Sequence, residues 1–499
     1  MINKFSHIIA ALIFGIFGAL AQEPYRSWPL GILFIGYLFY CWQQYITYKR
    51  KDYVLYFVIC WVTYANIVCN WLSYFSSFAT IAFIMLQGIF AFIFIYLGSK
   101  FSIKSVPTIY FAISFCTFEF ILGHIPTLSF TWLNISTIPI NISYLHNFIR
   151  AGGGALLTFI FVLISAKFSE LVFSKRKIFS FNLKVLTKNQ NIINVVLISF
   201  LLITFFLGNN VLDDTKPNYK ITIVQGNDIN RYLTKDEIDN DYLRNSHIDL
   251  AKNIDTNPDL IVFPESAFNV DPFDKSNRLV QDLKPIAKKA KSLMIINSNT
   301  YQGANYYNTN IFYNSNMKYI GKYSKKRLVP FGEYVPLKNV IGKWSVFKNI
   351  GEGFSPGKKD LTLKGITSLI CFESTFTDDF YRAITPSTKL MVITTNNRSY
   401  RLSGNSKQHL AQSKLRAIEF SIPVIHASVS GKSAIIGKDG ELIAQSEMFK
   451  NKLIEGSVNT SISRSFFLQY HDWVSFLCLI VVLWSVVLKA KESKWKKRI

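Results

Sequence analysis

Residues 323–333 read Tyr-Ser-Lys-Lys-Arg-Leu-Val-Pro-Phe-Gly-Glu, and the run continues through Tyr334-Val335-Pro336. The stretch predicts a loop that carries a candidate lysine, Lys325, next to Lys326, and a carboxylate, Glu333. Neither group alone indicates a function, because lysines and glutamates are common on loops. What this pair can do depends on the strands and the reactive side chains on either side of it.

Short β-rich runs flank this loop between Pro217 and Gly456. They predict strands at residues 221–224, 260–263, 293–296, 368–371, 391–394 and 423–426, and helices are predicted around 235–253, 276–290 and 405–421. Nearly continuous apolar runs suit strands that are buried on both faces of an α/β layer structure. Three of the runs end in reactive side chains, Glu265, Cys371 and Asn396. Catalytic groups usually gather at such strand ends in open α/β sheets.

The remaining sequence is far more apolar. The chain has 499 residues, half of them hydrophobic, and its apolar residues concentrate in stretches long enough for a helix to cross roughly 30 Å of hydrocarbon. We predict eight membrane spans near residues 4–22, 28–47, 53–75, 78–98, 107–123, 150–166, 192–208 and 472–488. The sixth is the least regular, because Gly152, Gly153 and Gly154 open it. Small residues there would allow close helix packing.

Basic residues predict the orientation, because Lys and Arg accumulate in short cytoplasmic loops. They cluster in the loops after spans 2, 4 and 6 and in the C-terminal tail, whereas the opposite short loops contain little more than Arg26 and Arg150. Both termini are therefore expected in the cytoplasm. The predicted domains are residues 1–208 with seven spans, an extracytoplasmic domain at 209–471, and the last span with its basic tail at 472–499. The formal charge of +24 then favours anionic lipid headgroups rather than nucleic acid.

The first span also allows another interpretation. Lys4, the apolar segment after it and the ending Ala19-Leu20-Ala21 imitate a secretory signal peptide with a cleavage site. Either outcome leaves the predicted orientation of the downstream spans unchanged.

Cysteine and histidine usage narrows the chemistry. Of six cysteines, five lie in predicted spans and only Cys371 lies in the outer domain, where it is either buried and inert or present for reactivity. The histidines do not form a metal-ligand spacing, and neither a phosphate loop nor a nucleotide fingerprint is present. We therefore expect no cofactor and no metal.

Three motifs occur in a recognisable order: Phe-Pro-Glu-Ser at 263–266, the run at 323–333, and Cys-Phe-Glu at 371–373. This order resembles the nitrilase, or carbon-nitrogen hydrolase, superfamily. Joined to eight spans, the middle motif resembles the apolipoprotein N-acyltransferases, over essentially the whole chain. The resemblance implies a bundle of about eight transmembrane helices plus a nitrilase-like α/β domain with αββα layers.

The resemblance also implies a catalytic triad of Glu265, Lys325 and Cys371. A thiol with an ordinary pKa of about 8.5 is mostly protonated at neutral pH, so a nucleophilic Cys371 needs a base. Glu265 can take that proton, and Lys325 can stabilise the thiolate and then the oxyanion on the attacked carbonyl. The family positions thought to support the site correspond to Glu333, Phe372, Glu373 and Asn396. Each of these residues alone has a structural explanation, and it is the joint occurrence that favours catalysis.

The family reaction is ping-pong. It would transfer an acyl chain from a phospholipid to Cys371 as a thioester, and then to the α-amine of a diacylglyceryl-cysteine at the start of a lipoprotein. The implied partners are thus phospholipid, lipoprotein and membrane lipid, without nucleic acid. The implied location is the inner membrane of a bacterium, with the catalytic domain in the periplasm. Glu119, within the fifth span, resembles a family glutamate and suits either packing or a lipid path.

Two segments depart from the family pattern. Asn396-Asn397-Arg398-Ser399-Tyr400 replaces an Asn-Asp segment followed by paired aromatics, and Val429-Ser430-Gly431 replaces an Asn-Thr-Gly. Phe372 stands for the usual tyrosine, and Tyr232 is the nearest aromatic to an expected tryptophan. These changes leave the acceptor open. The alternatives are acyl transfer to a different amine, a membrane-tethered amidase, and an inactive homologue that binds a partner.

Overall fold

The computed structural model describes residues 4–75, 77–103, 105–173, 188–209, 216–226, 234, 236–237, 241–336 and 353–496. The chain forms two compact units. Unit 1 comprises Met1–Ile125, Phe130–Asn210 and Ser465–Ile499, and unit 2 comprises Pro126–Ser129 and Val211–Arg464. The expected tryptophan position near Tyr232 and several basic loop residues, such as Lys175 and Arg176, lie outside the described residues.

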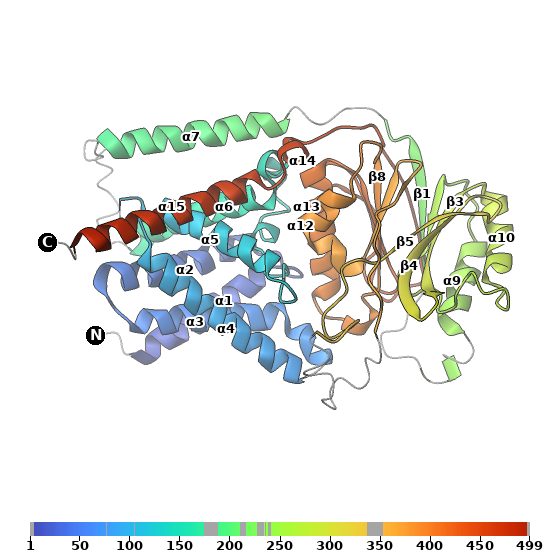
Figure 1. Ribbon diagram of the computed structural model, residues 1–499, viewed down its shortest axis with the longest axis horizontal. Coiled ribbons are helices and arrows are strands. Elements are labelled where there is room, and N and C mark those ends of the chain that lie inside the picture. Colours follow the sequence, from blue (N-terminus) through green and yellow to red (C-terminus); the bar gives the residue numbers. More distant parts are fainter. Residues whose placement is uncertain are drawn as a thin grey trace. The chain divides into compact units, whose positions relative to one another are not determined.

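Unit 1 is helical (Figure 1), and each of the eight intervals predicted to be apolar contains a helix. These helices are α1 (Lys4–Ala21), α2 (Trp28–Tyr48), α3 (Asp52–Val68), α4 (Ser77–Lys100), α5 (Pro107–His124), α6 (His146–Phe173), α7 (Lys188–Asn209) and α15 (Trp473–Lys496). Within the described residues, five helical segments are long and apolar enough to cross a membrane: Lys4–Ala21, Ser77–Lys100, Ser143–Val172, Ile192–Asn209 and Trp473–Ser493. Their exposed faces carry large apolar side chains such as Ile81, Val195 and Ile480, as lipid-facing surfaces do.

Two helices differ from the expected spans. The third is shorter than the interval 53–75, because α3 ends at Val68 and a 3-10 helix, η1 (Asn70–Tyr74), follows it. The sixth begins before its glycines, so that Gly152 and Gly153 lie inside α6 and interrupt its helical geometry. Gly153 has φ +67° and faces the ring of Phe467, with which a Cβ at this position would collide. The glycines therefore allow the close packing that the sequence suggested, but at a kink rather than at a helix start.

The described residues of unit 2 form two six-stranded sheets. The first has the order β12-β1-β2-β3-β4-β5 and the second has the order β11-β10-β9-β8-β7-β6. The strands of the first are β1 (Tyr219–Gln225), β2 (Leu260–Val262), β3 (Leu293–Gln302), β4 (Asn305–Tyr313), β5 (Tyr319–Ser324) and β12 (Lys452–Val458). The strands of the second are β6 (Thr362–Leu363), β7 (Ile366–Ile370), β8 (Leu390–Thr395), β9 (Val424–Ser428), β10 (Ala434–Ile436) and β11 (Leu442–Gln445). In each sheet three adjacent strands, β1-β2-β3 and β7-β8-β9, are parallel.

The two sheets pack face to face. Successive residues of β2 point to opposite faces: Leu260 and Val262 join a core with Val392 and Ile425 of the second sheet, whereas Ile261 lies on the other face. That other face is covered by α9 (Tyr242–Lys252) and α10 (Leu279–Ala290), through side chains such as Leu283. The far face of the second sheet is covered by α12 (Thr377–Ala383) and α13 (Asn405–Phe420) (Figure 1). The layers are thus αββα, as the resemblance implied.

The predicted strands and helices of unit 2 are present with shifted ends. The helix predicted at 235–253 has its described regular part at α9, residues 242–252, and part of the predicted range lies outside the described residues. Strands β4, β5, β6 and β10 to β12 were not predicted. β4 reads Asn-Tyr-Tyr-Asn-Thr-Asn-Ile-Phe-Tyr, and its buried asparagines bond side chains of the sheet interior instead of water.

Candidate active site

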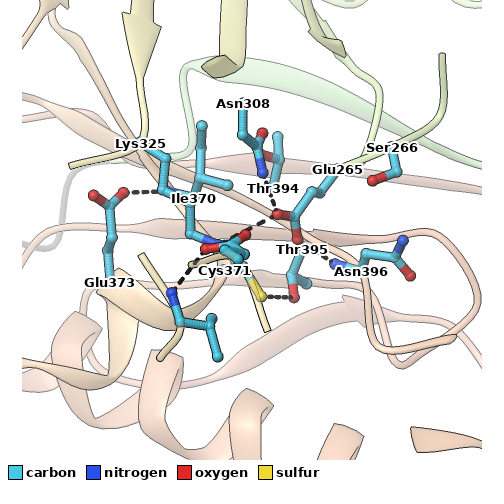
Figure 2. Close-up of polar contacts among 12 residues, drawn as sticks. Glu265, Ser266, Asn308, Lys325, Ile370, Cys371, Glu373, Thr394, Thr395 and Asn396 are labelled. Carbon is cyan, nitrogen blue, oxygen red and sulfur yellow. Dashed lines mark hydrogen bonds and ion pairs between the residues drawn. The ribbon is translucent and has the colours of Figure 1, made fainter. Parts of the chain in front are cut away.

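The reactive side chains come from the carboxyl ends of strands in both sheets. Glu265 follows β2 in the first sheet, Lys325 follows β5, Cys371 follows β7 in the second sheet, and Asn396 follows β8. Figure 2 shows the side chains of Glu265, Lys325 and Cys371 turned toward one another. Face-to-face packing of the sheets therefore assembles groups that are more than 100 positions apart in the sequence, Glu265 and Cys371.

Lys325 lies between two carboxylates. Its Nζ is 2.6 Å from Glu333 Oε1 and 3.5 Å from Glu265 Oε1, and its side chain is only 1% exposed. Burial acts to lower the pKa of Lys325, but the charges of Glu333 and Glu265 outweigh it and raise this pKa well above its usual value. Lys325 is therefore an ammonium group at neutral pH, held in place where water is excluded.

Both oxygens of Glu265 accept hydrogen bonds. Asn308 Nδ2 donates to Oε1 over 2.7 Å, and the backbone N–H of Asn396 donates to Oε2 over 2.7 Å. Asn308 is itself held by Asn297, whose Nδ2 donates to Asn308 Oδ1 over 2.8 Å. This chain of amides fixes the direction of the carboxylate without neutralising it, as a base requires.

Cys371 stands at a sharp turn between β7 and a 3-10 helix, η6 (Cys371–Thr375), with φ +52°. A positive φ is uncommon for a residue with a side chain, and such conformations cluster at functional sites. Burial and the charge of Glu265 raise the pKa of the Cys371 thiol to about 12, whereas Lys325 and a hydrogen bond from Thr395 act to lower it. The group at rest is therefore a thiol, which needs a base at the moment of attack.

Glu333 closes the lysine loop on itself. Its Oε2 accepts the backbone N–H of Val329 over 2.8 Å while Oε1 binds Lys325. Its own N–H donates to the carbonyl of Val329 over 2.9 Å, which completes a tight turn. The carboxylate therefore positions the lysine and contributes the second negative charge beside it.

Glu373 joins the lysine loop to the cysteine turn. Its Oε1 accepts the backbone N–H groups of Lys326 and Arg327, over 2.7 and 3.0 Å, and its Oε2 accepts the N–H of Ile370 over 2.8 Å. The hydroxyl of Tyr323 donates to the same carboxyl group over 2.8 Å. Because these donors flank Lys325 on one side and Cys371 on the other, Glu373 holds the two reactive groups at a fixed separation.

We expect Glu373→Gln to lower the free energy of unfolding by roughly 1–3 kcal/mol, since the amide NH₂ would face a backbone N–H that it cannot bond. Burial raises the pKa of Glu373 to about 7, against the lowering effect of the backbone N–H groups. The stability from this group is thus complete below its ordinary pKa and is lost as the pH rises through about 7. Thermal unfolding in detergent at pH 5 and pH 8 should show a larger penalty at pH 5. The exposed Glu447→Gln is the control, and equal penalties at both pH values would contradict the assignment.

The other two predicted supporting residues have different positions. Asn396 reaches Glu265 through its backbone N–H, while its side-chain Oδ1 accepts the N–H of Arg398 over 3.1 Å within the loop. Phe372 is buried, with its ring against that of Phe376 at 4.9 Å between centroids. Phe376 in turn stacks under the guanidinium of Arg327. Phe372 therefore supports the turn by packing.

Sequence reasoning missed several polar residues of the site. Asn308 donates a hydrogen bond to Glu265, and Tyr323 donates one to Glu373. Thr395 Oγ1 lies 3.3 Å from the sulfur of Cys371. The best signal for Thr395 was its place directly before Asn396 at the end of an apolar run. Among the described residues, no group of three or more His, Cys, Asp or Glu side chains could hold a metal ion.

Two known families match different parts of the chain. Residues 220–465 match the carbon-nitrogen hydrolase family, and residues 14–167 match the apolipoprotein N-acyltransferase N-terminal domain. Unit 2 is thus a carbon-nitrogen hydrolase domain of the nitrilase type.

Curated relatives extend the match to both parts of the chain. An apolipoprotein N-acyltransferase from Haemophilus ducreyi is 25% identical over 513 aligned residues, which cover 97% of each chain. One from Wigglesworthia glossinidia brevipalpis is 27% identical over 52% of this chain, and one from Geobacter metallireducens is 29% identical over 44%. The chain spans 55% and 44% of the lengths of these last two relatives. The chain belongs to the apolipoprotein N-acyltransferase family, and it is a membrane protein.

Solved structures also resemble about half of the chain. An amidase from Nesterenkonia sp. has 18% sequence identity and a TM-score of 0.35, and covers 52% of this chain and 95% of its own. A carbon-nitrogen hydrolase from Helicobacter pylori G27 has 14% identity and a TM-score of 0.35, and covers 52% of this chain and 92% of its own.

Proposed function

We propose that this protein transfers an acyl chain from a phospholipid to the α-amine of the diacylglyceryl-cysteine of a lipoprotein, through a thioester on Cys371. The observation that carries the proposal is the buried arrangement of Glu265 and Lys325 beside this cysteine, with Nζ 3.5 Å from Oε1. A thiol, a carboxylate and an ammonium group together suit nucleophilic attack on an acyl carbonyl. Membership of the apolipoprotein N-acyltransferase family supports the choice of substrates.

In the first half-reaction, Glu265 takes the proton of Cys371 as the sulfur attacks the ester carbonyl of the phospholipid. A carbon–sulfur bond forms, and the carbonyl oxygen becomes an oxyanion that the ammonium group of Lys325 stabilises. When the intermediate collapses, the carbon–oxygen bond breaks. The lysophospholipid oxygen leaves with the proton returned by Glu265.

In the second half-reaction the lipoprotein amine attacks the thioester. Glu265 accepts a proton from the amine, a carbon–nitrogen bond forms, and Lys325 again stabilises the oxyanion. The carbon–sulfur bond then breaks, and the sulfur keeps the electron pair before it regains its proton. Since one carboxylate serves both steps, it must stay close to the sulfur throughout, a requirement met by its fixed hydrogen bonds to Asn308 and Asn396.

The membrane unit would confine the two lipid substrates next to the catalytic domain. Confinement in one plane replaces much of the entropy cost of collecting two lipids from solution. We further propose that eight helices span the membrane, that both termini are cytoplasmic and that residues 209–471 lie in the periplasm. The distribution of Lys and Arg among the short loops supports this orientation.

Mass spectrometry tests the proposal directly. Purified protein mixed with phospholipid should gain the mass of one acyl chain, located on the peptide that contains Cys371, and should then lose it to a diacylglyceryl peptide with a free α-amine. The same peptide with an acetylated amine should leave the acyl-enzyme intact. Release of free fatty acid at the same rate with either peptide would instead indicate hydrolysis, and absence of the thioester would refute the proposal.

A further inference from the structure

The hydroxyl group of Thr395 has more acceptors than it can serve at once. Its Oγ1 lies 2.6 Å from Asn397 Oδ1, 3.3 Å from Cys371 Sγ and 3.3 Å from His409 Nδ1. A hydroxyl group carries a single proton and can donate it to one strong acceptor at a time. The identity of its acceptor in each state of the enzyme therefore depends on the groups around it.

The neighbours of His409 determine which of its nitrogens carries the proton. Nε2 lies 3.1 Å from the backbone oxygen of Cys371 and 2.9 Å from Ser374 Oγ, whose own proton is donated to that same carbonyl over 2.8 Å. A carbonyl oxygen only accepts hydrogen bonds, so Nε2 carries the proton and Nδ1 is an acceptor. Burial lowers the pKa of His409 to about 4, so the ring is neutral at physiological pH.

The amide of Asn397 is oriented in a similar way. Its Nδ2 faces Asn405 Oδ1 at 3.0 Å and His409 Nδ1 at 3.4 Å, and both are acceptors. Nδ2 is therefore the donor toward these two groups, and Oδ1 faces the Thr395 hydroxyl. Asn397, Asn405 and His409 are all nearly completely buried, which prevents water from replacing any of these contacts.

We propose that Thr395 is a further catalytic residue. In the resting enzyme its hydroxyl group donates a hydrogen bond to Asn397 Oδ1, and it donates instead to the sulfur of Cys371 whenever that sulfur becomes an anion. The short contact to Asn397 is favoured while the sulfur is a thiol or a thioester, both of which are weak acceptors. A thiolate is a much stronger acceptor, since hydrogen bonds to charged groups are roughly twice as strong as neutral ones.

The consequence is greatest when the thiolate leaves the thioester, and this part of the inference rests on the proposed function. As the amine nitrogen bonds to the carbonyl carbon, the carbon–sulfur bond breaks and the electron pair stays on sulfur. Thr395 then donates its hydrogen bond to that sulfur, while the proton of the amine passes to Glu265 and on to the sulfur. Asn397 occupies one of the segments that depart from the family pattern. In the other segment, a Cβ at Gly431 would collide with the Cβ of Asn397.

Variants at position 395 separate this role from packing. Thr395→Val and Thr395→Ala lack the hydroxyl group, Thr395→Ser retains it, and Thr367→Val removes a buried hydroxyl of strand β7 that bonds Thr388 over 2.8 Å. Full-length protein in detergent is treated with iodoacetamide at pH 9, and alkylation of the Cys371 peptide is followed by mass spectrometry. Because only the thiolate reacts, we expect Thr395→Val and Thr395→Ala to react roughly tenfold more slowly than wild type. Thr395→Ser and Thr367→Val should react at nearly the wild-type rate.

The second measurement is release of the acyl chain from preformed thioester to the diacylglyceryl peptide. Thr395→Val should slow this release roughly tenfold and accumulate the acyl-enzyme, with recovery in Thr395→Ser. Slow alkylation in Thr395→Val combined with no acyl transfer by the wild type would refute the proposed function and keep the role of Thr395. Normal transfer by the wild type combined with unchanged rates of alkylation and release in Thr395→Val and Thr395→Ala would refute the role of Thr395 alone.

Discussion

Glu265→Gln is expected to lower the rate of thioester formation roughly 1,000-fold while making Cys371 more reactive toward iodoacetamide. The two effects have opposite signs because the carboxylate acts on the thiol in two ways. It accepts the proton during attack, which an amide cannot do. Its negative charge also raises the pKa of Cys371, so its removal beside the remaining ammonium group of Lys325 lowers that pKa and increases the thiolate fraction.

Both rates are measured on the same preparation, by acyl transfer from phospholipid and by alkylation of the Cys371 peptide across a range of pH. The exposed Glu441→Gln serves as the control for a change of one charge on the same domain. A variant that lost both activities together would indicate a collapsed site. One that kept acyl transfer would show that Glu265 is not the base.

Lys325→Met is the second substitution with a large expected effect. It should lower both the rate of acyl transfer and the free energy of unfolding. Without the ammonium group the oxyanion has no positive partner, which we expect to cost roughly 100- to 1,000-fold in acyl transfer. In the wild type, Lys325 Nζ lies 3.5 Å from Glu265 and 2.6 Å from Glu333. In the variant both carboxylates would remain buried without this shared cation. Breaking a buried ion pair by removing one partner typically costs about 3–5 kcal/mol.

The pH dependence of this stability loss follows from the raised pKa of Lys325. The contribution of a group with a raised pKa is complete below its ordinary pKa, about 10.4 for lysine, and is lost only as the pH rises through its folded value. The destabilisation should therefore be the same at pH 6 and pH 9 in thermal unfolding. The exposed Lys389→Met is the matched control. A penalty that disappeared toward pH 9 would mean that Lys325 loses its proton in that range.

The reactive residues could be found in the sequence because each follows an apolar run. Glu265, Cys371 and Asn396 come directly or soon after β2, β7 and β8, and parallel strands bring their carboxyl ends to one edge. The motif around Lys325 added the fourth group. Long apolar helices were equally visible, because lipid requires a continuous apolar stretch.

The polar supports were not visible for a physical reason. Asn297 of β3 donates hydrogen bonds to Asn308 and Asn310 of β4, and Asn308 donates one to Glu265. A buried asparagine has the same sequence signature as one exposed in a turn. Thr395 is likewise an ordinary strand residue until the structure places its hydroxyl beside the sulfur. The roles of such residues depend on their neighbours across the sheet. Those neighbours are distant in the sequence, so no local sequence pattern reveals them.

The base and the nucleophile are carried by different sheets. Their spacing depends on the apolar layer between the sheets, with residues such as Val262 and Val392, and on the hydrogen bond from the Asn396 N–H to Glu265. Catalytic activity thus depends on how the two sheets pack against each other. A small shift of one sheet against the other would separate Glu265 from Cys371 and abolish activity while every strand and helix was still intact. On heating, this protein should therefore lose activity at a lower temperature than it loses secondary structure.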